Sequence, residues 1–261
     1  TIFVFDSDAA AANTLTINAD ADGAGEGSIN IAAGKTLTIS VGQDGDGANK
    51  NAVNLTLVGA VVGADDTSIL NITTNADAAN TISLGAATDM STGTITLNND
   101  SDSVVIAGGA NLTGNIDNGT GTAGKGTLTY SGGADTTITG TIGATNSLKA
   151  ITADVTGEGA DALAFSSTVA ATTITITGTN DTDEVKFNGD VTGNIAIVDG
   201  ALITVAADKT ITGSVTTTDT DGVLTFGTAT VAKTLVSGSI GATGADLSVL
   251  NVATGAGITS T

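Results

Sequence analysis

The sequence Ile138-Thr139-Gly140-Thr141-Ile142 is one of five copies of a pentad that reads apolar, hydroxyl, glycine, small polar, apolar. The other copies are Leu112–Ile116, Val191–Ile195, Ile211–Val215 and Val236–Ile240. The step between the central glycines Gly140 and Gly193 is about twice as long as the other three steps, so it should hide one degenerate copy. A recurrence of roughly 20 to 26 residues is typical of stacked repeats.

Glycine in the middle of a strand-like pentad weakens the strand, so its presence needs a structural reason. We interpret it as a corner, where the chain turns and a Cβ would clash with the next coil. Corners that recur at one place would stack glycine on glycine, and we expect all five glycines to line one edge of the molecule.

Between the pentads, polar and apolar residues alternate in short runs such as Thr36–Ile39, Thr94–Leu97 and Thr173–Ile176. Strict alternation with threonine and β-branched residues is typical of half-buried strands. The sequence therefore predicts an all-β fold, a parallel β-helix or β-solenoid with coils of roughly 20 to 26 residues. Repeats of a β-sandwich with glycine at bulges are the alternative.

Longer segments also repeat. Residues 106–116 align with residues 205–215 at an offset of 205 − 106 = 99, and Ile142–Thr145 aligns with Ile240–Thr243 at 240 − 142 = 98. Val62–Asp65 resembles an earlier copy of the second segment. We expect an N-terminal cap or assembly strand in residues 1–27 and a solenoid in residues 28–261, with internal repeats at 31–74, 106–157 and 205–255.

The composition restricts the function. The formal net charge is −20, with seven lysines and no arginine, which disfavours nucleic acids and anionic membranes as partners. No apolar stretch reaches the ~18 residues of a spanning helix, so we expect no direct membrane insertion. The chain has 36 glycines and no proline, cysteine, histidine or tryptophan, and aromatic residues make up 2%. A thin core of Val, Ile, Leu and Ala fits this composition.

Without histidine or cysteine, and with three glutamates, the sequence favours a non-catalytic protein, and a polysaccharide-active enzyme is the least favoured hypothesis. Clustered acids in turns suggest a structural Ca²⁺ ion as a cofactor, because this ion prefers oxygen ligands. The first candidate ligands are Asp181, Asp183 and Glu184, and the second are Asp100 and Asp102. The alternative is that these acids are solvated turn formers.

The run Ile2-Phe3-Val4-Phe5 holds two of the five phenylalanines. It is either a cap over the first coil or an edge strand that pairs with the last coil of a second copy, around Leu247, Val249 and Val252. The first residues lack the basic segment and the long apolar run of a signal peptide, so we expect a mature or excised extracellular portion, with any signal or anchor outside it.

The coils rich in Thr, Ala, Gly and Asn, with Ile138–Thr145 followed by Leu148–Ile151, resemble the passenger regions of rickettsial-type autotransporter surface antigens. The general texture also resembles bacterial S-layer proteins. This resemblance implies an extracellular β-solenoid on the bacterial cell surface. Our leading hypothesis is a structural subunit that assembles with itself into a surface layer or filament. The alternative is an adhesin passenger that binds a host or environmental surface.

Overall fold

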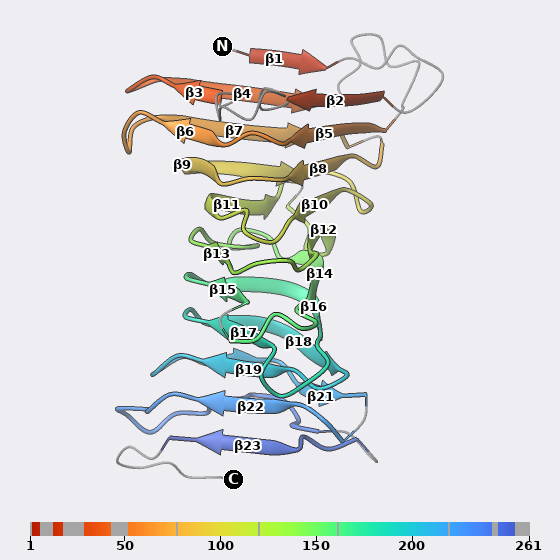
Figure 1. Ribbon diagram of the computed structural model, residues 1–261, viewed down its shortest axis with the longest axis vertical. Helices are drawn as coiled ribbons and strands as arrows, with labels where there is room; N and C mark the ends of the chain where they lie inside the picture. Colours follow the sequence, from red (N-terminus) through yellow and green to blue (C-terminus); the bar gives the residue numbers. More distant parts are fainter. Residues whose placement is uncertain are drawn as a thin grey trace.

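The runs that alternate threonine with Val, Ile or Leu form parallel strands, because these residues suit an extended and half-buried backbone. The computed structural model describes residues 2–5, 13–17, 29–42, 52–76, 78–119, 121–160, 162–218, 220–241 and 245–253. Within these ranges there is no helix. The strands stack along one long axis, with β1 (Ile2–Phe5) and β23 (Val249–Val252) at opposite ends of the stack (Figure 1).

Each coil passes over three faces in the same order, which we name face A, face B and face C. Face A contains β3 (Ile29–Ile31), β6 (Val61–Gly63), β13 (Thr136–Ile138), β15 (Leu163–Phe165), β17 (Glu184–Phe187), β19 (Leu202–Val205), β22 (Val223–Phe226) and β23. Face B contains β1, β4 (Thr36–Val41), β7 (Ile69–Thr74) and β20 (Ile211–Thr212). Face C contains β2 (Asn13–Ile17), β5 (Val53–Leu57), β8 (Thr81–Leu84), β10 (Ser103–Ile106), β12 (Lys125–Tyr130), β14 (Leu148–Asp154) and β21 (Val215–Thr217).

Four longer strands run around a corner. The strands β9 (Thr88–Leu97) and β11 (Leu112–Asn118) pass from face A to face B, and β16 (Val169–Thr177) and β18 (Val191–Val198) pass from face B to face C. The pairing register shifts at the corner of β11 and at the corner of β16, because the chain turns there. Faces A and B are thereby joined in one continuous sheet.

Paired residues form one ladder along each face. The face A ladder is Ile29, Val61, Thr88, Leu112, Ile138, Phe165, Phe187, Val205, Phe226 and Val252. The face B ladder is Phe3, Ile39, Ile72, Ile95, Ile116, Ile142, Val169, Val191, Ile211 and Val236. The face C ladder is Leu15, Leu55, Ile82, Val104, Leu128, Ile151, Ile174, Ile195, Val215 and Ile240. The three ladders are equally long in the described part of the chain.

The predicted parallel β-solenoid is confirmed, and all of the strand pairings in the described ranges are parallel, unlike those of a β-sandwich. The coils vary more in length than the glycine spacing indicated. The shortest step along the face A ladder runs from Phe187 to Val205, and the longest runs from Ile29 to Val61.

The interior is thin and almost entirely aliphatic, as the composition predicted. Ladder residues such as Ile72, Ile95 and Ile116 are fully buried. The buried phenylalanines sit on the face A ladder, where the rings of Phe165 and Phe187 stack with centroids 5.3 Å apart and planes 5° from parallel, and the buried Tyr130 lies on face C. Stacking identical side chains from coil to coil fills the core without the interdigitation of two sheets.

The pentads turn the chain at two different corners. Those of Gly114 and Gly140 lie between faces A and B, and those of Gly193, Gly213 and Gly238 lie between faces B and C. Within each corner, glycine stacks on glycine. A Cβ on Gly140 would lie 1.8 Å from the carbonyl oxygen of Gly114, and one on Gly213 would lie 2.1 Å from that of Gly193. The predicted close approach is therefore confirmed, whereas the prediction of one shared edge is wrong.

The long step between Gly140 and Gly193 contains the expected degenerate copy. It is Phe165–Val169, with Ser167 in place of glycine, and it continues the corner between faces A and B. The sequence Phe187–Val191 is a further copy at the same corner, where a Cβ on Gly189 would lie 2.3 Å from the carbonyl carbon of Ser167. The sequence analysis missed it because an asparagine occupies the hydroxyl position.

Successive copies of the longer repeat begin on different faces of the rod, each one face further round than the copy before it. Val62–Ile72 runs from face A to face B, Ile142–Ile151 runs from face B to face C, and the related ends Ile240 and Leu250 lie on faces C and A. The two offsets, 142 − 62 = 80 and 240 − 142 = 98, therefore correspond to whole coils plus one face. The same short sequence can therefore form a strand on any of the three faces.

Candidate assembly interface

The N-terminal end of the rod presents three strands, one from each face. Strand β1 pairs with β4, from Ile2 opposite Thr38 to Phe5 opposite Val41, while β2 pairs with β5 and β3 pairs with β6. In the described ranges no strand pairs with the other edge of β1, β2 or β3. The run Ile2–Phe5 thus forms part of the first coil within its own chain and keeps an outer edge for a further strand.

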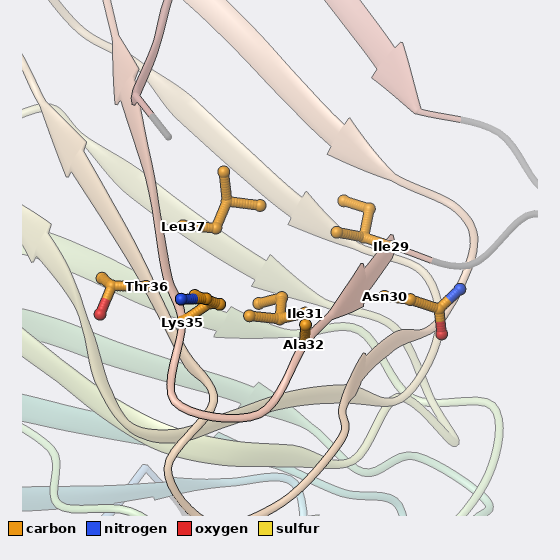
Figure 2. Close-up of a pocket in the computed structure, with 7 residues that line it drawn as sticks. All are labelled: Ile29, Asn30, Ile31, Ala32, Lys35, Thr36 and Leu37. Atoms are coloured by element: carbon orange, nitrogen blue, oxygen red, sulfur yellow. The ribbon is translucent and has the colours of Figure 1, made fainter.

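A pocket of about 370 Å³ lies at this end, where β3 turns into β4. Its apolar lining comes from Ile29, Ile31 and Leu37, and Lys35 completes the wall (Figure 2). The side chain of Asn30 points away from the others (Figure 2). Because β1 begins its pairing only at Thr38, the described chain places no strand over the stretch that lines the pocket.

The C-terminal end of the rod exposes apolar side chains. Strand β23 pairs with β22 along one edge, and no described strand pairs with its other edge. Leu250 is 47% exposed, Ile240 is 42% exposed and Val249 is 41% exposed, although Leu250 and Ile240 continue rows that are buried inside the rod. Leu247 and Val252 are partly buried against the core. No described strand covers these side chains on the side that faces away from the rod.

The residues predicted for assembly therefore lie at the two ends of the rod rather than together. Strand β1, with Ile2, Phe3, Val4 and Phe5, is at one end, and strand β23, with Val249 and Val252, is at the other (Figure 1). Leu247 lies two residues before β23 in the chain. The sequence analysis missed Ile29, Leu37 and Ile240. The last residue of the final pentad is Ile240, and this position was a signal that could have identified it.

The acidic turn predicted as the first calcium site is built around a buried carboxylate. Asp183 is 1% exposed, and its oxygens accept hydrogen bonds from the backbone N–H groups of Thr179 (2.8 Å), Gly157 (3.1 Å) and Gly159 (3.2 Å) and from the Thr179 hydroxyl (3.0 Å). Burial by itself raises the pKa of Asp183, but the N–H donors outweigh burial and hold the pKa below its ordinary value. The ionised carboxylate ties two coils together.

The second acidic turn has the same construction. Asp102 is fully buried, and its carboxylate accepts hydrogen bonds from the N–H groups of Asn80 (2.8 Å), Asn98 (3.0 Å) and Asn99 (2.8 Å). The Thr74 hydroxyl donates a further hydrogen bond of 2.5 Å. The first residue of each turn closes an Asx turn, from Asn99 in one case and from Asn180 in the other.

These contacts leave few oxygens for a cation. Asp100 is exposed and lies 3.4 Å from the ammonium of Lys125, while Asp181 is exposed and Glu184 is buried at the start of β17. No group of three or more acidic side chains in the described ranges is arranged to hold a metal ion. Calcium binding at either turn stays a prediction, and calorimetric titration of the protein tests it.

No helix in the described ranges is long and apolar enough to span a membrane. Comparison with known proteins finds no matching family model, no matching curated protein and no matching solved structure.

Proposed function

We propose that this protein is a non-catalytic structural subunit on the outside of a bacterial cell, where copies of the β-solenoid assemble end to end into a surface layer or filament. The observation that carries this proposal is that both ends of the rod present unpaired strand edges in the described ranges, together with exposed apolar residues or an apolar pocket. Unpaired edges are templates for further strands.

The forces that hold the rod together would also hold two rods together. Every coil is stabilised by backbone hydrogen bonds and apolar contacts to its neighbours, and a second copy at either end adds another neighbour of the same kind. A head-to-tail contact between unlike ends does not close on itself, so it produces filaments.

The charge of the chain opposes this assembly at low salt. A net charge of −20 on each copy makes two rods repel, and salt screens this repulsion over a Debye length of about 10 Å at 0.1 M. We therefore expect association to strengthen as the salt concentration rises, whether the added cation is Na⁺ or Ca²⁺.

Sedimentation velocity at increasing protein and salt concentrations, combined with negative-stain electron microscopy, tests the proposal. We expect rods whose lengths are multiples of one unit. Rods of a single length at every concentration would contradict the proposal and would favour the adhesin hypothesis, which binding to host or environmental surfaces would then examine. Degradation of a polysaccharide by the purified protein would instead support an enzyme.

A further inference from the structure

We propose that neighbouring copies share one coil, in which β23 of one copy supplies face A and β1 and β2 of the next copy supply faces B and C. This inference rests on the proposed function and specifies the contact that would produce the filament. It makes the two ends of the rod complementary halves of one layer rather than two independent adhesive surfaces.

The outermost layer at each end of the rod is incomplete, and the two ends lack strands on different faces. At the N-terminal end, β1 and β2 form a layer on faces B and C, and no described strand lies beside them on face A above β3. At the C-terminal end, β23 forms a layer on face A, and no described strand lies beyond Val236 on face B or beyond Ile240 on face C. Each end therefore has what the other end lacks.

The three ladders also continue across such a junction. Stacking one copy on another places Val252 of the first copy next to Ile29 of the second on face A, Val236 next to Phe3 on face B, and Ile240 next to Leu15 on face C. All three joins pair an apolar residue with an apolar residue. Because the ladders are equally long, one rotation satisfies all three faces at once.

The pocket and the exposed residues lie at these joins. Ile29 is both the last face A ladder residue at the N-terminal end and the first residue of the pocket lining. Ile240 is the last face C ladder residue at the C-terminal end, and 42% of it is exposed. In the shared coil, β23 of one copy would cover Ile29 of the next copy on face A, and β2 of the next copy would pair beyond Ile240 on face C.

Among the candidate occupants, the geometry favours a second copy over any other segment. Strand β23 already has the parallel direction and the inward row of Leu250 and Val252 that face A requires. A segment of the same polypeptide that preceded β1 could also lie on face A, since each coil crosses face A before face B. The experiment below separates these two occupants.

Two single-cysteine variants, Asn30→Cys and Ala253→Cys, test the junction, because the chain has no other thiol. Both positions are exposed, and the ladder places residue 253 of one copy opposite residue 30 of the next. Neighbouring strands lie about 4.8 Å apart, which a disulfide can bridge. Thr173→Cys, exposed on β16 in the middle of the rod, is the control for side-by-side association.

The variants are mixed in pairs under mild oxidation, and the linked products are separated by mass. We expect the mixed disulfide between Asn30→Cys and Ala253→Cys to be the main product. A mixture of Thr173→Cys with either of these variants should give no disulfide-linked product. Filaments without this mixed disulfide, or with links between two identical variants, would overturn the shared coil while leaving self-assembly standing. A protein that stays monomeric would overturn both proposals and would favour a segment of the same polypeptide above β3.

A second test uses Ile240→Lys, with Val231→Lys as the matched control. Val231 is 59% exposed and lies on the same terminal coil but on none of the three ladders. Both substitutions reduce the negative charge equally, so repulsion between copies does not explain a difference between them. We expect Ile240→Lys to abolish filaments and Val231→Lys to retain them, with equal thermal unfolding of the dilute monomers. Equal assembly of the two variants would overturn the junction on face C.

Discussion

Two copies of the pentad, one at the corner between faces A and B and one at the corner between faces B and C, use their central glycines differently. At the first corner Gly140 has an ordinary backbone conformation and is required because the neighbouring coil is too close for a Cβ. At the second corner Gly213 meets an equally close coil and also has a φ of +148°, which L side chains rarely adopt. The difference belongs to these two pentads and not to their corners, because Gly114 between faces A and B has a φ of +136° and Gly238 between faces B and C has no positive φ.

The largest expected effect comes from adding a methyl group at the two corners. Gly140→Ala should destabilise the rod by about 3 kcal/mol, because the Cβ would force two backbones apart. Gly213→Ala should cost about 1 to 3 kcal/mol more, because of its positive φ. Urea unfolding followed by circular dichroism measures both values.

The control for this comparison is Gly121→Ala, where no atom lies within 4 Å of the added Cβ and φ is +70°. It should cost about 1 kcal/mol for the left-handed conformation alone. If Gly213→Ala proved no more destabilising than Gly140→Ala, these two pentads would not differ in this way.

The two acidic turns give a second comparison of the same kind. Asn99–Asp102 lies at the corner between faces B and C, and Asn180–Asp183 lies at the corner between faces C and A, but both bury the final carboxylate against N–H groups. Asp183→Asn and Asp102→Asn should each cost about 2 kcal/mol, because an amide replaces a carboxylate that accepts several hydrogen bonds. Asp181→Asn, at an exposed position of the same turn, should be close to neutral.

The pH dependence of stability tests whether the negative charge of the Asp183 carboxylate is what stabilises the fold. The pKa of Asp183 is lower in the folded protein than its ordinary value of 3.8, so its contribution is present above about pH 4 and is lost as the pH falls through the folded pKa. Thermal unfolding of the wild-type protein should therefore decline more steeply below about pH 4 than that of Asp183→Asn. Parallel curves for the two proteins would contradict this assignment.

These comparisons explain which parts of the structure could be predicted from the sequence. The alternation of threonine with β-branched residues predicted the strands, and the glycine spacing predicted stacked coils, because both signals depend on neighbouring residues alone. The assignment of Gly114 and Gly213 to one edge failed, since any corner of the rod accepts the same pentad. Which corner a pentad occupies depends on how many residues the preceding corners contain, from Phe187 to Val205 or from Ile29 to Val61.

The acidic turns show a different limit of sequence reasoning. The acids of Asn99–Asp102 and Asn180–Asp183 suggested a cation because they are clustered in turns. The donors that surround Asp183 include backbone N–H groups of Gly157 and Gly159 on the preceding coil, and a backbone donor leaves no signal in the sequence. The pocket at Ile29 and Leu37 was missed for a related reason, because it depends on where β1 begins to pair.

The smallest expected effect concerns the polar residue that follows the corner glycine. At the corner between faces A and B, the side-chain oxygen of Asn115 accepts hydrogen bonds of 2.9 Å from both the backbone N–H and the hydroxyl of Thr141. At the corner between faces B and C, the side-chain oxygen of Asn194 accepts a hydrogen bond of 3.0 Å from the N–H of Ser214. In both cases the asparagine links one coil to the next.

Because each asparagine is partly or fully solvated, Asn115→Ala and Asn194→Ala should each cost about 1 kcal/mol, with the loss at Asn115 the larger because it accepts one more hydrogen bond. Thermal unfolding of the two variants and of the wild-type protein measures the difference. Thr141→Val removes only the hydroxyl donor, so in that background the cost of Asn115→Ala should fall to the cost of Asn194→Ala. If Asn194→Ala were silent while Asn115→Ala was not, the asparagine contact would stabilise the stacking of coils at the corner between faces A and B only. The corner between faces B and C would then depend on its glycine packing, on backbone hydrogen bonds and on hydroxyl contacts such as that of the Gly213 N–H with Ser237.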